Sequence, residues 1–428
     1  MKLLWASNSP WAPSGYGTQT LQVVKRLKAA GHDVAIAANF GIQASSIEHE
    51  SLPGVPVLPA LYDGIGNDIL PAHYHAWANG EPTYLITLYD VWPYAKDRFA
   101  DIPIASWVPV DHYPAPPAVA AWCKDHQAIA MSRFGEGRLT DALLIEHATS
   151  LDPDGTMDPA LRRKRAEAAL DASGVRPYYI PHALEPGVYR PIPGARASLE
   201  WDPDAFVVLI NAANKGANMR KAWSEMFGAL ALFMDKHPDV RVHLHTERIG
   251  AQSPDLQQLL DAWRIDSNRV TWTPQYQLKI GEISPEDVAR LYSASDVLLA
   301  TSKGEGFGIP VVEAQACGTP VIVSNWTAQP ELVGGGWLAD VQPDWDPVQA
   351  AFFCTPIISS IVARLEDAYD ARGDETIRAK ALAKAAEYDA DKVFAEHWVP
   401  FIASLEEKLK EPVPLGRAER RRRAKAVA

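Results

Sequence analysis

The sequence predicts an α/β protein made of two domains, each a mainly parallel β-sheet covered by helices. Short apolar runs rich in β-branched residues alternate with amphipathic segments along the chain, which is the pattern of βαβ units. The length of 428 residues is more than one ordinary domain needs. Hydrophobic residues make up 47% of the composition, enough to fill two cores.

The first unit runs from a strand at residues 2–6 through a loop to a helix at about 18–30 and a second strand at 33–38. Its loop contains Gly15-Tyr16-Gly17. A dinucleotide fingerprint needs a third glycine soon after these two, and none is present, so the unit disfavours NAD.

Further strands are expected at 55–58, 83–89, 104–110 and 128–132, with a loop-rich stretch at 40–82. Polar residues follow two of these strands, namely Asp90 after one, and Asp111 and His112 after another. The carboxyl ends of parallel strands face the ligand crevice, so these side chains are candidate site residues. His73 and His75 alternate as on a strand or loop, and no further ligands at suitable spacing support a zinc site.

The second half repeats the alternation. It has a strand at 206–211, a basic loop and a helix ending near 233, then strands at 240–246 and 269–273. Residues 275–281 are expected to be a loop, followed by a helix at 286–293 and a strand at 296–301. Helices at 357–371 and 376–387 come next. A segment at 393–410 carries apolar residues at helical spacing.

The stretch between residues 302 and 314 carries the clearest functional pattern. Gly304, Gly306 and Gly308 would let the backbone approach a ligand, and the helix that follows would point its free N–H groups at the same place, which suits an anion. Glu305 and Glu313 are good acceptors for sugar hydroxyls. The combination predicts a nucleotide-sugar site. The helix is expected to end with Gly318 and Pro320, before a strand at 320–324.

The segment 291–322 resembles the retaining GT-B glycosyltransferases that carry the E-x7-E motif, also described as family 4-like or group 1 glycosyl transferases. The resemblance implies two Rossmann-like domains facing a central cleft, with the last helix crossing back to the first domain. It implies an acceptor domain at 1–185 plus a returning helix at about 390–411, and a donor domain at 186–389. Residues 412–428 would form a basic tail.

The resemblance also implies roles for individual residues. Glu305, His112 and Asp111 are the expected catalytic residues. The expected donor-binding residues are Gly15, Tyr16, Gly17, Lys215, Arg220, Lys221, Gly306, Phe307, Gly308, Ile309 and Glu313. Two departures stand out. Lysine and arginine are exchanged at 215 and 220, with Lys221 as an alternative for the second position. Asp111 precedes His112, and either could face the donor sugar.

The expected reaction is transfer of a hexose from a nucleoside diphosphate sugar, with retention of configuration at the anomeric carbon. A UDP-sugar is the first choice of donor and a GDP-sugar the second. The acceptor hydroxyl could belong to a glycan, a protein, a small molecule or a modified nucleic acid. Neither a metal nor another cofactor is expected. Two alternatives stay open, an epimerase or phosphorylase on the same fold, and an inactive adaptor that binds sugar nucleotides or nucleic acid.

The formal net charge of −12 argues against a general nucleic-acid binder. Residues 417–425 nevertheless hold six basic side chains against one acidic side chain, so this tail is either solvated or binds an anionic partner. No apolar run is long enough to span a membrane. Cys123, Cys317 and Cys354 form neither a metal pattern nor a disulfide framework, so a cytoplasmic location is expected.

Overall fold

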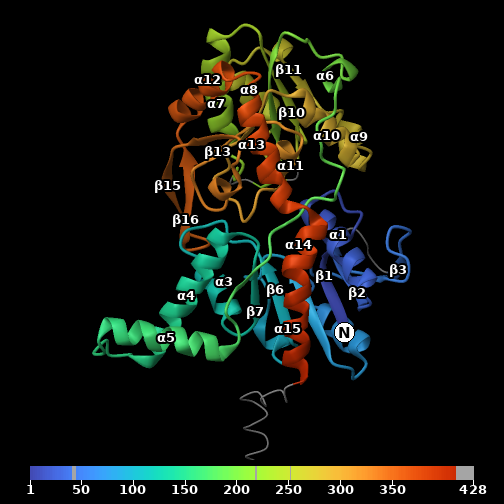
Figure 1. Ribbon diagram of the computed structural model, residues 1–428, viewed down its shortest axis with the longest axis vertical. Helices are drawn as coiled ribbons and strands as arrows, with labels where there is room; N and C mark the ends of the chain where they lie inside the picture. Colours follow the sequence, from blue (N-terminus) through green and yellow to red (C-terminus); the bar gives the residue numbers. More distant parts are fainter. Residues whose placement is uncertain (41–44, 217–218, 251, 411–428) are drawn as a thin grey trace, which may run out of the picture.

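The computed structural model describes residues 1–40, 45–216, 219–250 and 252–410, and the predicted basic tail lies outside this part of the chain. Two lobes are stacked along the long axis of the molecule (Figure 1), the N-terminal one below and the C-terminal one above. Each lobe is built on its own parallel sheet.

The first sheet has the strand order β3-β4-β2-β1-β5-β6-β7-β8. All of its pairs are parallel except β3 with β4. Its strands are β1 (Lys2–Asn8), β2 (Asp33–Phe40), β3 (Ile47–Glu48), β4 (Pro56–Leu58), β5 (Thr83–Leu88), β6 (Ile104–Val108), β7 (Gln127–Ala130) and β8 (Tyr178–Tyr179). The helices of this lobe are α1 (Gly15–Ala29), α2 (Leu70–Ala78), α3 (Pro117–Cys123), α4 (Arg133–Leu151) and α5 (Pro159–Ser173).

The second sheet has the order β11-β10-β9-β12-β13-β14, with every pair parallel. Its strands are β9 (Phe206–Asn211), β10 (Val240–His245), β11 (Val270–Trp272), β12 (Val297–Ala300), β13 (Val321–Ser324) and β14 (Gly336–Ala339). The helices around it are α6 (Ala195–Ser198), α7 (Trp223–Lys236), α8 (Leu256–Ala262), α9 (Gln275–Ile280), α10 (Pro285–Ala294), α11 (Ile309–Ala316), α12 (Ile358–Asp370) and α13 (Glu375–Ala385).

The end of the described chain returns to the first lobe, as predicted. The segments α14 (Ala390–Val393), a π-helical turn (Phe394–Trp398) and α15 (Val399–Lys410) run down beside β1 and α1 (Figure 1). Trp398 is fully buried there, with its ring centroid 5.6 Å from Trp5 and 5.1 Å from Trp107. The predicted fold class, two parallel-sheet domains with a returning helix, is confirmed.

Two local predictions are wrong, and one element was not predicted. Residues 70–78 and 275–280 are the helices α2 and α9 rather than strand or loop. Residues 341–356 form an antiparallel hairpin of β15 (Val341–Asp346) and β16 (Ala351–Pro356), which the sequence reading left without an element. Pro343 and Pro347 interrupt the local pattern of this hairpin, and most of β15 is exposed, so no apolar alternation marks the strand.

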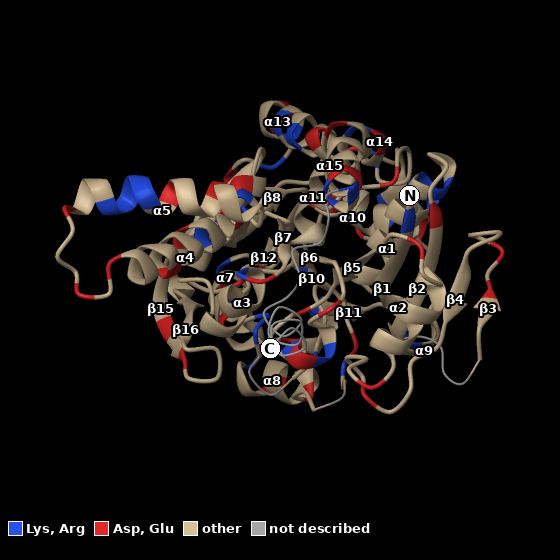
Figure 2. Ribbon diagram, turned by 90° about the horizontal axis from the view of Figure 1, so that it is seen from below, with Lys and Arg blue, Asp and Glu red and all other residues tan. Residues whose placement is uncertain are grey.

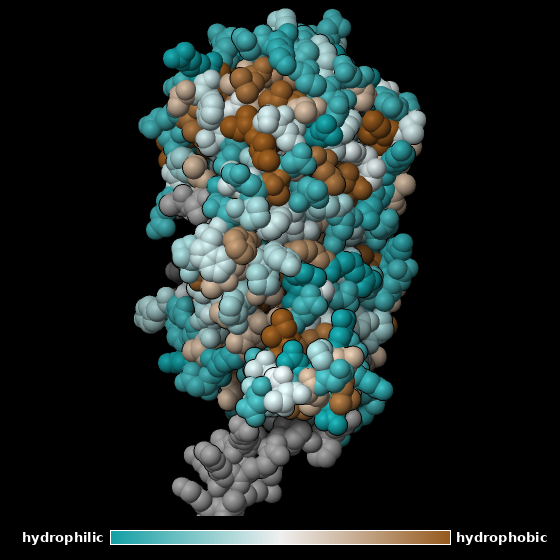
Figure 3. All heavy atoms as spheres, turned by 90° about the vertical axis from the view of Figure 1, so that its left-hand side faces the viewer, coloured by the Kyte–Doolittle hydropathy of each residue, from teal (hydrophilic) through white to brown (hydrophobic). Residues whose placement is uncertain are grey.

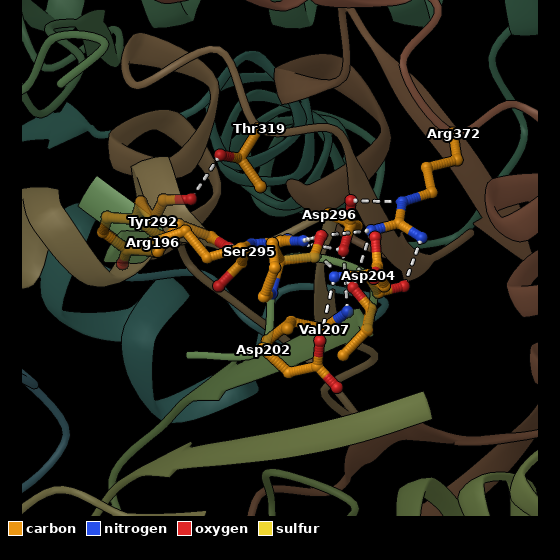
Figure 4. A network of polar contacts seen from close by, with 12 residues as sticks. Arg196, Asp202, Asp204, Val207, Tyr292, Ser295, Asp296, Thr319 and Arg372 are labelled. Atoms are coloured by element: carbon orange, nitrogen blue, oxygen red, sulfur yellow. Dashed lines mark hydrogen bonds and ion pairs between the residues drawn. The ribbon is translucent and has the colours of Figure 1, made fainter. Parts of the chain in front are cut away.

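An ion-pair network secures the start of the second sheet (Figure 4). One Asp296 carboxylate oxygen lies 2.7 Å from Arg196 Nη2 and accepts a 2.7 Å hydrogen bond from the backbone N–H of Val207. The other lies 3.3 Å from Arg372 Nε. These contacts join α6, β9, β12 and the end of α12, and so fix the frame on which the loops of the site are held.

An arm formed by α4 and α5 projects from the first lobe (Figure 2), and a band of basic residues lies on α5. In the run Arg162 to Arg165, the last three side chains are exposed and Arg162 is half-buried. This part of α5 is therefore a solvated helix face.

Candidate active site

The candidate site lies where the carboxyl ends of the two sheets meet. In the second sheet the strand order reverses between β9 and β12, and a doubly wound sheet binds its ligands in the crevice at such a point. The loop after β12, residues 301–308, meets the loop after β6, residues 109–113. Residues from both domains therefore form one site.

Glycines in the first of these loops allow the two domains to touch. A Cβ on Gly304 would lie 2.1 Å from the Asp111 carbonyl oxygen, and one on Gly306 would lie 2.7 Å from Pro109 Cβ. We predicted that these glycines give a ligand access to the backbone. In the structure they give the first domain access, so a side chain at either position would push the domains apart.

Glu305 is held by two cations from the loop after β9. Arg220 Nη1 lies 3.1 Å from one carboxylate oxygen of Glu305, and Lys221 Nζ bonds the other. Arg220 also donates to the Gly304 carbonyl at 2.8 Å. Burial alone would raise the pKa of Glu305, but the charges of Lys221 and Arg220 outweigh it and lower the pKa to about 2. Glu305 is therefore ionised at neutral pH.

The N-terminus of α11 lies on the other side of Glu305. Gly308 is its N-cap residue, with a φ of 116° that only glycine adopts readily, and no side chain caps the first turn. The free N–H groups there favour an anion. A cavity of about 20 Å³ lies between Lys221, Glu305, Gly308 and Pro310. This volume holds about one water molecule and no sugar nucleotide.

Glu313 lies within α11 and is almost fully buried, at 8% exposure. Its carboxylate accepts a 2.8 Å hydrogen bond from the Tyr292 hydroxyl, which in turn accepts one of 2.7 Å from Asn211. Burial raises the pKa of Glu313, although hydrogen bonds from Tyr292 and Tyr189 oppose that shift. The side chain is thus occupied by tyrosines in this state, and its predicted role as a ribose ligand stays a prediction.

His112 is clamped between two carboxylates and an aromatic ring. Its Nδ1 lies 2.7 Å from Asp111 and its Nε2 lies 3.2 Å from Asp346 of the hairpin. The Phe353 ring centroid is 3.7 Å from that of the imidazole. Burial alone would raise the pKa of Asp111, but the hydrogen bond with His112 and the charge of Arg220 lower it. Asp111 also lies 3.6 Å from Arg220, which connects this cluster to Glu305.

Other predicted donor residues take different places. Phe307 packs between the rings of His182 and Tyr388, with 4% exposure, so its side chain fills the core between the domains. Lys215 is exposed and lines neither cavity beside Glu305. The cations that meet at Glu305 are therefore the neighbours Arg220 and Lys221. Binding of the donor diphosphate by Lys215 and Arg220 stays a prediction.

The first glycine loop has a mainly packing role in this state. A Cβ on Gly15 would lie 3.0 Å from Ile309 Cδ1, so the starts of α1 and α11 are in contact. A Cβ on Gly17 would lie 2.4 Å from the Ala12 carbonyl oxygen. The Tyr16 ring packs on Tyr89 at 5.8 Å, and burial raises its pKa well above the usual value.

A second and larger cavity, of about 480 Å³, has Arg220 in its lining. Its lining includes Asp90 and Trp92 of the first domain and residues 344–349 of the hairpin. Sequence reasoning missed the hairpin and with it Asp346, Phe353 and this wall. It also missed Tyr292 as the partner of Glu313, since only the folded chain brings α10 and α11 together.

Within the described ranges, no three histidine, cysteine, aspartate or glutamate side chains gather in a way that could hold a metal ion. Among the same residues, no helix has both the length and the apolar composition to cross a bilayer. The three cysteines are buried and free.

Comparison with known proteins agrees with this geometry. Residues 276–346, which include Glu305 and Glu313, match the family model described as "Glycosyl transferases group 1". Over this segment the chain is similar to the group 1 glycosyltransferases. A D-inositol 3-phosphate glycosyltransferase of Streptomyces bingchenggensis is 24% identical over 366 residues, or 79% of this chain and 75% of that protein.

Two more relatives align over shorter stretches. The enzyme of the same name from Segniliparus rotundus is 25% identical over 292 residues, which is 64% of this chain, and the match spans only 55% of that relative. The O-antigen chain mannosyltransferase B of Escherichia coli is 41% identical over 71 residues, or 17% of this chain and 19% of that protein.

Solved structures show that the chain has the GT-B fold. The sucrose-phosphate synthase of Thermosynechococcus elongatus superposes with a TM-score of 0.63 at 19% identity, covering 96% of this chain and 99% of that one. The Anabaena protein Alr3699/HepE, in complex with UDP-glucose, gives 0.63 at 17% identity, covering 94% and 100%.

Proposed function

We propose that the chain transfers a hexosyl group from a nucleoside diphosphate sugar to a hydroxyl acceptor, with retention of the anomeric configuration. The observation that carries this proposal is the placement of Arg220, Lys221 and the N-terminus of α11 around Glu305. Two cations and free backbone N–H groups suit a diphosphate, and a carboxylate beside them suits a sugar.

The diphosphate of the donor would replace Glu305 as the anion that Arg220 and Lys221 bind. Negative charge grows on the leaving diphosphate as the glycosidic bond breaks, and fixed cations stabilise that charge by several kcal/mol in comparable sites. No metal ion is needed for this role in the proposal, because these two side chains supply the positive charge.

Glu305 would act on the sugar. It is ionised, with a pKa of about 2, so it can accept hydroxyl hydrogen bonds and stabilise positive charge at the anomeric carbon. The acceptor hydroxyl would attack the same face that the diphosphate leaves, which gives retention. Because the 20 Å³ cavity is too small for the donor, the loops that line it would have to move apart to admit the donor and then close again.

The donor is proposed to be a UDP-sugar, with a GDP-sugar as second choice. The structure of the Anabaena neighbour was solved in complex with UDP-glucose, which supports a UDP-sugar ahead of a GDP-sugar as the donor. Glu313 would meet the donor ribose after Tyr292 moves aside.

The test is a panel of UDP-, GDP-, ADP- and TDP-sugars, with released nucleoside diphosphate measured for the wild type, Lys221→Met and Lys215→Met. The two variants make the same chemical change on the same loop. Lys221 contacts Glu305, whereas Lys215 is exposed. We expect Lys221→Met to lower the release rate at least about 100-fold, the loss of one stabilising charge, and Lys215→Met to change it less than about threefold.

A larger loss of release rate in Lys215→Met than in Lys221→Met would show that the donor diphosphate binds at Lys215, as predicted from the sequence. The absence of both binding and turnover with every donor would refute the proposed function. The anomeric configuration of the product, read by NMR, decides retention separately.

A further inference from the structure

The larger cavity has the place and the opening of an acceptor site. It has a volume of about 480 Å³, and one of its lining residues is Arg220, which contacts Glu305. Glu305 itself lines the small donor-side cavity. Binding sites for small ligands commonly have volumes of 300–1,000 Å³. An acceptor in the larger cavity would therefore face the sugar that Glu305 holds.

One wall of this cavity is the β15–β16 hairpin, and its position is fixed. Backbone hydrogen bonds of 3.0 and 2.8 Å join Tyr113 to Phe352 across the domain boundary. His112 adds its contacts to Asp346 and Phe353. The hairpin thus spans from the second domain to the first and presents Asp344 and Trp345 at a defined place.

The charge of the lining is negative. Four carboxylates line the cavity, against Arg220 and Lys303; these carboxylates are Asp90, Asp111, Asp344 and Asp346. The two cations already have partners, since Arg220 bonds Glu305 and Lys303 Nζ lies 3.5 Å from Glu225. Asp111 and Asp346 share His112. The other two carboxylates are less compensated.

Asp90 makes no hydrogen bond or ion pair with any residue that the structure describes. The groups that face it are Asp111, His112 and Arg220. Asp344, on the hairpin, is exposed and accepts only a 3.3 Å hydrogen bond from Thr355 among the described residues. Both carboxylates are thus available to accept hydrogen bonds from a ligand, and both repel a second anion.

Exposed aromatic side chains complete the lining. Trp92 is 48% exposed and Trp345 is 51% exposed. An apolar ring face packs well on an indole ring, which also repels negative charge above its own face. Around the junction of the domains, the molecular face that carries the hairpin is mostly hydrophilic with small apolar areas (Figure 3). This surface suits a hydroxyl-rich ring better than a lipid.

We propose that the cavity binds an uncharged polyhydroxylated ring, a saccharide or cyclic polyol, as the acceptor, and discriminates against its phosphate esters. Asp90 and Asp344 accept hydroxyl hydrogen bonds, and the two tryptophans cover the apolar face of the ring. This acceptor differs from the phosphorylated inositol in the names of the actinobacterial relatives. The inference rests on the proposed function.

The test compares matched acceptors with the donor that the panel identifies. The pairs are myo-inositol with inositol 1-phosphate, and methyl α-glucoside with its 6-phosphate. We expect the neutral member to have a kcat/KM about tenfold higher, the size of a partly screened repulsion. Asp90→Asn and Asp344→Asn should each shrink this ratio at least threefold, while Asp154→Asn, on an exposed loop, leaves it unchanged. Calorimetric titration of each ring, with nucleoside diphosphate bound, reads the same preference without turnover.

The outcomes separate the two proposals. Donor turnover together with tighter binding of the phosphate ester overturns the acceptor inference alone. An unchanged ratio in both aspartate variants does the same. Failure of every donor to bind or turn over defeats the proposed function instead.

Discussion

At the scale of single residues, Glu305 has two competing roles. It neutralises Arg220 and Lys221, the cations that the proposed donor would need, and it is also the carboxylate that we propose acts on the sugar. Glu305→Gln keeps the shape and removes the charge, so an incoming diphosphate no longer competes with it. We expect the Kd of the nucleoside diphosphate to fall several-fold and sugar transfer to slow at least about 100-fold.

Calorimetry and steady-state rates check the two halves of this prediction. Glu407→Gln, at a position whose side chain is 74% exposed on α15, is the matched control and should change neither. Weaker nucleotide binding in Glu305→Gln would show that the glutamate supports the cations instead of blocking them.

Asp90 gives a prediction about pH. Asp90 keeps an exposed surface in the cavity, but desolvation of its carboxyl group by the surrounding protein, followed by the charge of Asp111, raises its pKa to about 6 from an ordinary value near 3.8. The folded protein then holds a proton that the unfolded chain has lost between about pH 4 and pH 6, so ionising Asp90 makes stability fall as pH rises through this window. Asp90→Asn should raise the Tm at pH 7.5 and leave it almost unchanged at pH 4. Calorimetric scans at both pH values test this, and an equal shift at both would contradict it.

How far single residues can be predicted from sequence depends on what fixes them. Glu305 and Glu313 follow from the local loop and helix pattern, because a turn and a helix start are encoded by neighbours in the chain. Which lysine meets Glu305 depends instead on the path of the loop after β9, which spacing alone does not determine. The orientation of Phe307 is set by His182 and Tyr388, which belong to distant segments.

At the scale of elements, the glycines of the loop at residues 301–308 allow the two domains to make close contact. Gly304→Ala places a Cβ 2.1 Å from the Asp111 carbonyl oxygen, so backbone must move. We expect transfer to fall about 100-fold, as misplacement of about 1 Å can cause. Gly137→Ala in α4, where a Cβ meets nothing within 4 Å, should keep full activity and gain up to about 1 kcal/mol of stability. Wild-type activity in Gly304→Ala would mean that the reactive state does not need this contact.

Elements with strong periodicity were the predictable ones. Buried strands such as β9 and β12 are continuous apolar runs, and α11 has a glycine at each end. The helices α2 and α9 have only nine and six residues, too short for a helical period to outweigh other readings. The β15–β16 hairpin is held by contacts with the other domain, so its own sequence carries little of the information.

At the scale of the whole molecule, the chain crosses between domains twice, and the second crossing stabilises the first domain. Trp398 fills a buried place against Trp5 and Trp107. Trp398→Ala should lower the free energy of unfolding of the first domain by about 3–5 kcal/mol. Val399→Ala, beside it but 50% exposed, should cost less than about 1 kcal/mol. Urea unfolding followed by circular dichroism measures both, and similar midpoints for the two variants would refute the assignment.

The hairpin has a consequence for modular engineering of this enzyme. Because a GT-B protein has two domains, a chimaera can be made by fusing the N-terminal half of one protein to the C-terminal half of another. Here the wall that carries Asp344 and Trp345 is encoded in the C-terminal half, although it faces Asp90 and Trp92 of the N-terminal half. A fusion made near residue 185 would divide the proposed acceptor cavity between two parents. A transplant of acceptor preference would have to carry residues 341–356 along with the N-terminal half.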